Sequence, residues 1–203
     1  MRVYGNAREA DIAFPPFSNR QFFRQLSFSR ALSDFNADEE LRMIIASILK
    51  EYEKYISLLD NTIKQLNGDE FFQHIADENN SAAVILKHIS GNLISRLTNF
   101  MTEDGEKDWR NRDGEFEVPD EDMKDLLSQW EIAKGLVKIE VGKLKDEDIS
   151  KVVRVRGERM SVVEALVRNV SHFSYHVGQI VFIAKTIKGD SWNNQSIPLK
   201  KSR

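Results

Sequence analysis

Two histidines lie four residues apart in the apolar segment VSHFSYHVGQIV, residues 170–181. In a helix, residues four apart stack on one face, so His172 and His176 would point in the same direction. Imidazoles arranged in this way can each offer a ring nitrogen to one metal ion. The alternative is a pair of hydrogen-bonded core histidines, and the pattern taken alone favours that alternative.

A third histidine, His88 in the segment ILKHISGN, lies in the middle of another segment with helical periodicity. The fourth and last, His74, falls between predicted helices, where a surface or packing role is the simpler interpretation. A metal site therefore needs a fold that brings His88 close to the other pair.

Four segments have the periodicity of long helices. Apolar residues recur at steps of three and four over residues 38–66, and Asn67-Gly68 is a typical helix end. The second helix is predicted over residues 81–101, where Gly91 costs about 1 kcal/mol in propensity and so indicates a packing reason. The third follows Pro119, with the acidic run 120–122 in its first turn, where the helix dipole favours anions.

The fourth helix has the clearest start. Ser161 and Glu164 have the spacing of a capping box, and Gly189 supplies the stop signal. The preceding segment VVRVRG, residues 152–157, alternates apolar and basic residues, which predicts a short strand or hairpin. Together these elements predict an all-α fold, a four-helix bundle with a short β strand or hairpin before the last helix. Residues 1–36 are predicted to be an N-terminal extension, and residues 37–203 the bundle domain.

The composition narrows the function classes. The chain has 203 residues, of which 41% are hydrophobic and 30% charged, with a net charge of −3. This charge gives no reason to expect nucleic-acid binding, and no apolar run is long enough to span a membrane. The absence of cysteine excludes disulfides, thiolate zinc sites and a cysteine nucleophile, and fits the reducing cytoplasm in which we expect the protein.

The segments HISGNLISRLTNF, EDGEKDWRNRDGEFE, VVRVRGERMSVVEAL and SHFSYHVGQIV resemble the DinB/YfiT-like superfamily, most closely an uncharacterised branch of it. The resemblance covers roughly residues 38–198. It implies a homodimeric four-helix bundle with a divalent metal ion, such as Zn, Ni or Fe, held by His88, His172 and His176. Relatives include transferases that use small thiols such as bacillithiol or glutathione. The resemblance therefore implies a metal-dependent thiol S-transferase acting on an electrophilic small molecule, and the alternatives are a non-catalytic metal-binding or stress-response bundle and a metal-free helical interaction module.

Other polar residues are candidates for supporting roles. Asn169 and Gln179 flank the histidine pair and could accept hydrogen bonds from ligand imidazoles, although simple core hydrogen bonds explain them equally well. Asn92, Arg96, Trp109 and Arg110 are candidates for substrate binding, the arginines because guanidinium groups bind carboxylates. The competing interpretation is that Trp109 anchors the long loop at residues 102–118 and that the arginines pair with its acidic residues.

Overall fold

The computed structural model describes residues 44–77 and 80–195. The predicted extension, residues 1–36, lies outside these residues, as does the predicted start of the first helix. The helices are α3 (Ile44–Ile63), α4 (Gly68–Phe72), α5 (Ala82–Leu97), α6 (Met123–Leu136) and α7 (Val162–Lys188), and the strands are β1 (Val152–Val155) and β2 (Glu158–Ser161). Short 3-10 helices lie at Asp113–Phe116, Asp146–Asp148 and Gly189–Ser191, and α6 continues into a π-helical turn at Val137–Val141.

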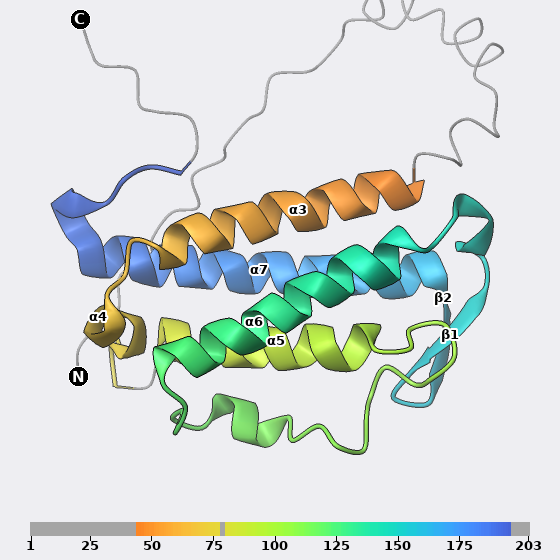
Figure 1. The fold of residues 1–203 in the computed structure, drawn as a ribbon, viewed down its shortest axis with the longest axis horizontal. Helices are drawn as coiled ribbons and strands as arrows, with labels where there is room; N and C mark the ends of the chain where they lie inside the picture. Colours follow the sequence, from red (N-terminus) through yellow and green to blue (C-terminus); the bar gives the residue numbers. More distant parts are fainter. Residues whose placement is uncertain (1–43, 78–79, 196–203) are drawn as a thin grey trace, which may run out of the picture. The chain divides into compact units, whose positions relative to one another are not determined.

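The four long helices form a bundle (Figure 1). Helix α3 packs against α7, and α5 packs against both α6 and α7. The π-helical turn after α6 contacts α3 and so closes the bundle on its remaining side. The two strands form an antiparallel hairpin just before α7. The predicted architecture, an all-α four-helix bundle with a short hairpin before the last helix, is confirmed.

An aromatic cluster in the core sets the rotation of α7. Phe173 is buried, stacks with Tyr52 of α3 at 6.1 Å between ring centroids, and lies 5.8 Å from the ring of Trp130 of α6. Successive residues of a helix are about 100° apart around its axis. With Phe173 directed at α3 and α6, His172 and His176 therefore point toward α5.

The first loop differs from its prediction. Helix α3 ends at Ile63 rather than near Leu66, and Asn67 begins α4 instead of ending α3. The Asn67 side chain accepts a hydrogen bond from the backbone N–H of Glu70, whose carboxylate accepts one from the Asn67 N–H. Asn67 and Glu70 thus form the reciprocal bonds of a capping box. The prediction was wrong here because asparagine favours the first position of a helix as well as the position after its end.

The other boundaries were predicted with mixed accuracy. Helix α5 ends at Leu97, short of the predicted residue 101. Asp122 is the N-cap of α6 and accepts a hydrogen bond from the Asp125 N–H, so the acidic run 120–122 precedes the first turn instead of forming it. The capping box of α7, with Ser161 and Glu164, is confirmed, and so is the stop at Gly189, where φ is 50°.

The hairpin is joined to the loop between α5 and α6. Its two turn residues, Arg156 and Gly157, have φ values of 57° and 76°. Both donate backbone N–H bonds to the carboxylate of Asp104, at 2.8 and 2.7 Å. The loop and hairpin therefore hold each other over one end of the α5–α7 face. No helix in the described part of the chain is both long and apolar enough to cross a membrane.

Candidate metal centre

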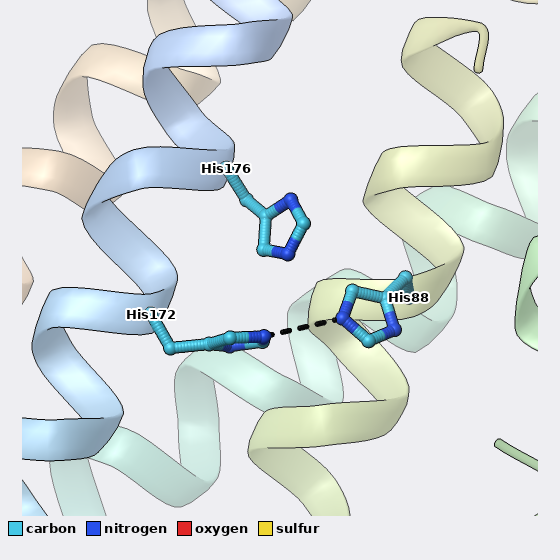
Figure 2. A group of neighbouring side chains, drawn as sticks. All are labelled: His88, His172 and His176. Atoms are coloured by element: carbon cyan, nitrogen blue, oxygen red, sulfur yellow. Dashed lines mark hydrogen bonds between the residues drawn. The ribbon is translucent and has the colours of Figure 1, made fainter. Parts of the chain in front are cut away.

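Three histidines from two helices converge on one point between α5 and α7 (Figure 2). His88 projects from the middle of α5, and His172 and His176 project from consecutive turns of α7. One ring nitrogen of each lies within 4.8 Å of the corresponding atoms of the other two, and the Nε2 atoms of His88 and His172 are 3.3 Å apart. The ring of residue 88 thus faces the pair on α7.

Hydrogen bonds orient two of the three rings. Nδ1 of His88 lies 2.8 Å from Oε2 of Glu115, and Nδ1 of His176 lies 2.7 Å from Oε1 of Gln179. A carboxylate or amide oxygen accepts, so each Nδ1 carries a proton, and Nε2 is the nitrogen left to face a metal ion. An acceptor on the far nitrogen is the usual support of a metal-binding imidazole, since it fixes the tautomer and raises the ring's basicity.

The centre fits a metal ion on three observations. Nε2 of His176 is buried and has no hydrogen-bond partner among the described residues. Two nitrogens bound to one tetrahedral ion at about 2.0–2.1 Å lie roughly 3.3–3.4 Å apart, which matches the distance between His88 and His172. Burial, with the nearby rings contributing, lowers the pKa of His172 to about 4, and burial lowers that of His176 to about 4 despite the opposing bond to Gln179. Both rings are therefore neutral, and able to bind a cation, at neutral pH.

Behind His88 lies a buried ion pair between Arg110 and Glu115, which agrees with the interpretation that the loop arginines pair with its acidic residues. The contact of this pair with His88 is what the sequence did not predict. The Glu115 carboxylate accepts two bonds of 2.8 Å from Arg110, through Nε and Nη2, as well as the bond to His88. Burial raises the pKa of Glu115, but the hydrogen bonds from His88 and Arg110 and the charge of Arg110 outweigh it and hold the pKa below its usual value. Glu115 is therefore a carboxylate that both orients His88 and neutralises Arg110.

Gly91 gives Glu115 the space for this role. A Cβ atom at Gly91 would overlap Oε1 of Glu115 and lie 2.9 Å from its Cδ. The packing reason expected for this mid-helix glycine is thus the approach of a loop carboxylate to α5, one turn from His88.

A comparison with protein-family models matches residues 40–201 to a family described as "Protein of unknown function (DUF1572)". The chain belongs to this family. No curated protein and no solved structure matches the chain significantly. The family description names no activity, so the function of this DUF1572 protein is inferred from the site itself.

A cavity of about 430 Å³ opens beside the three histidines. Asn92, Arg96, Asn169 and Gln179 line it. Gln179 has the bond to a histidine ring expected of it, whereas Asn169 bonds Tyr52 and Asn92 in the core, as the alternative interpretation of this residue has it. Trp109 does not line it and is 60% exposed, and Arg110 does not line it because its guanidinium is committed to Glu115.

Three further arginines reach the cavity or its rim: Arg112, Arg156 and Arg168. Arg168 lies four residues before His172 on α7, so the helical spacing that relates His172 to His176 also predicts its position. Asn169, beside the histidine pair, is among the residues predicted from the sequence, and Arg168, the charged residue that precedes it, is not. Glu115 had no such signal, because it lies in a loop with several acidic residues.

Proposed function

We propose that His88, His172 and His176 bind one divalent metal ion, and that the DUF1572 family is a branch of the DinB/YfiT-like superfamily. The observation that carries the first proposal is the convergence of one ring nitrogen from each histidine, together with a buried Nε2 of His176 that has no hydrogen-bond partner among the described residues. Imidazole ligands suit Zn, Ni or Fe. The resemblance of the segments around these histidines supports the second proposal.

We further propose that the centre is catalytic and acts on a small molecule. Structural zinc sites use four protein ligands, whereas catalytic sites use three and leave a position open. The described residues bring three histidines together here, beside a cavity large enough for a small substrate. A structural ion would need no such space.

The resemblance supports a thiol S-transferase, in which a bacillithiol- or glutathione-like thiol attacks an electrophile. A divalent ion in this centre would lower the pKa of a bound thiol and so supply the thiolate. The chain has no cysteine, so a sulfur nucleophile must come from a small molecule. Within the site, Glu115 and Gln179 hold the histidine rings, and Asn92 and the arginines are placed to hold the substrate.

Elemental analysis of untagged protein tests the metal proposal. We expect about one divalent ion per chain in the wild type and close to none in His172→Ala, with unchanged helical circular dichroism because His172 is half-buried at the cavity rim. His74→Ala is the matched control, since it removes a histidine outside the centre. Equal metal content in His172→Ala and wild type would refute the ligand assignment.

A screen of small thiols against electrophiles, with the ion found, tests the catalytic proposal. Turnover that is absent from His172→Ala supports it, and bound metal without turnover favours the non-catalytic alternative. The homodimer and the cytoplasmic location stay predictions, and light scattering in solution tests the first of them.

A further inference from the structure

The cavity beside the histidines has a strongly cationic lining. Arginine side chains reach it from four directions: Arg96 from α5, Arg112 from the loop, Arg156 from the hairpin turn and Arg168 from α7. No aspartate or glutamate is among the described residues that line it. A cleft lined by one sign of charge concentrates ligands of the opposite sign.

The protein neutralises this charge incompletely. One carboxylate oxygen, Oε2 of Glu106, serves both Nη2 of Arg96 at 3.0 Å and Nε of Arg156 at 2.8 Å. Nη1 of Arg96 is buried without a hydrogen-bond partner among the described residues. Arg112 reaches the exposed carboxylate of Asp113, at 3.4 Å. Guanidinium donors are thus left over for a ligand.

Arg168 is the least committed of the four. It makes no hydrogen bond or ion pair with any residue that the structure describes. It lies on the cavity side of α7, four residues and roughly 6 Å of helix rise before His172. Arg168 and His172 therefore line the same cavity from positions about one helical turn apart on α7.

Arg156 occupies a backbone position that suits another residue. The two-residue turn Arg156-Gly157 has positive φ at both positions, which Asn-Gly adopts most readily and arginine adopts at a cost. Strained residues of this kind concentrate where a side chain has a function. The guanidinium of Arg156, which reaches Glu106 and the cavity, supplies a reason for it.

Asn92 adds a neutral donor. The buried Tyr52 hydroxyl donates to Oδ1 of Asn169 at 2.5 Å, and Nδ2 of Asn169 donates to Oδ1 of Asn92 at 3.2 Å. Burial raises the pKa of Tyr52, so its hydroxyl keeps the proton that it donates to Asn169. The direction of both hydrogen bonds, from Tyr52 to Asn169 and from Asn169 to Asn92, follows from this. Asn92 therefore has its amide N–H groups left to offer the cavity.

We propose that this cavity binds a small molecule bearing a carboxylate or phosphate group, with that oxyanion held by Arg168 and the Arg96–Arg156 pair. The reacting end of the molecule then lies at the three histidines, with Asn92 as a further donor. The reaction at that end rests on the proposed function, whereas the oxyanion site does not require a bound metal. Guanidinium groups bind both kinds of oxyanion through paired, charge-assisted hydrogen bonds.

The test measures binding of simple anions to full-length protein freed of metal with a chelator. Inorganic phosphate and propionate are titrated separately and followed by NMR, with ethylammonium as the cationic counterpart. We expect one or both anions to bind at the cavity and ethylammonium not to, and the tighter anion identifies the natural group. Arg168→Gln and Arg156→Asn should each weaken anion binding about tenfold, the usual effect of losing a charge-assisted bond.

Two features of the variants separate a binding role from a structural one. Arg159→Gln, which removes a charge from β2 at a residue that does not line the cavity, is the matched control and should bind anions like the wild type. Arg156→Asn should fold about as stably as the wild type, because the better fit of Asn-Gly to the turn offsets the loss of the partly exposed ion pair with Glu106. Absence of anion binding, tighter binding of ethylammonium, or wild-type affinity in both cavity variants would overturn the proposal.

A second measurement distinguishes failure of this proposal from failure of the metal proposal. Cobalt-loaded protein is titrated with 3-mercaptopropionate and with cysteamine, and the thiolate-to-cobalt absorption is recorded. Tighter binding of the carboxylated thiol, lost in Arg168→Gln, supports the oxyanion site, and equal binding of the two thiols counts against it. Cobalt that does not bind at all refutes the metal centre and leaves the anion titration to decide the oxyanion site.

Discussion

If the three histidines bind a metal ion as proposed, Gly91→Ala should weaken that binding although Gly91 contacts none of the proposed ligands through a side chain. The new methyl group would overlap Oε1 of Glu115, whose carboxylate is fixed by Arg110 on one side and His88 on the other. A free glutamate side chain would swing away from such a methyl group at little cost. Here the carboxylate moves only by lengthening or breaking those bonds.

The magnitude follows from opposing contributions. Alanine stabilises a helix by about 1 kcal/mol relative to glycine. Each charged hydrogen bond lost from Glu115 costs roughly 1.5–3 kcal/mol, so the metal-free protein should lose about 0.5–2 kcal/mol for one broken bond. Displacing the acceptor of a metal-binding histidine typically lowers metal affinity by about 10–100-fold. The loss of affinity should therefore be the larger signal.

Chelator competition for zinc and urea unfolding of the metal-free protein measure the two effects. Gly135→Ala is the matched control, a glycine next to the last residue of α6, before the π-helical turn, with no neighbouring atom within 4 Å of a Cβ atom at that position. It should gain up to about 1 kcal/mol in unfolding free energy and bind zinc normally. If Gly91→Ala gains stability as Gly135→Ala does and keeps wild-type zinc affinity, the role assigned to Glu115 is wrong.

Three further predictions concern neighbouring contacts. Gln179→Leu removes the acceptor of His176 and should lower zinc affinity about 10–100-fold in chelator competition, with little change in urea unfolding because Gln179 is exposed. The lowered pKa of His172 and of His176, about 4 in each case, keeps both rings neutral as pH falls from 7 to 5.5. Protons should therefore compete little with zinc for these two rings until pH approaches 4, whereas each ring of ordinary pKa 6.5 would lower zinc affinity about tenfold at pH 5.5. Asp104→Ala removes the acceptor of the Arg156 and Gly157 amides, so their hydrogen exchange should accelerate while exchange in the middle of α7 stays unchanged.

Residues on the long helices were predictable because their contacts repeat with the helical period. His172 and His176 share a face by spacing alone, and Ser161 with Glu164 marks the start of α7 through a purely local pair of hydrogen bonds. Signals of this kind need no knowledge of the rest of the fold. Asn67 shows where such local signals fail, because asparagine is common both at the start and just past the end of a helix. Only the structure shows that its side chain bonds the free N–H of Glu70, and so begins α4.

The pairing of loop residues was not predictable in the same way. Glu115 and Arg110 lie in the loop at residues 102–118, which has several acidic residues and two arginines, with Arg96 nearby on α5. The spacing of these residues does not say which acidic side chain is buried. The choice depends on the path of the loop over α5, which brings residue 115 back to a helix 27 positions earlier in the chain. Gly91 is a local sign of that path: a residue of low helix propensity stands in α5 where a Cβ atom would collide with Glu115.

The two kinds of arginine in this protein show how the same side chain divides between structure and ligand binding. The side chain of Arg110 is 2% exposed and has the Glu115 carboxylate as its partner, so removing Glu115 would leave a buried charge unpaired, a change that usually costs about 3–5 kcal/mol. Arg168 is exposed and makes no hydrogen bond or ion pair with any described residue, so its removal should change the free energy of unfolding little. If Arg168 served only solubility, its position on the stripe of His172 and His176 would be incidental, and Arg168→Gln would bind phosphate, propionate and 3-mercaptopropionate as the wild type does. A tenfold loss for anions, with unchanged unfolding free energy and unchanged binding of cysteamine, is the outcome that only a ligand-binding role explains.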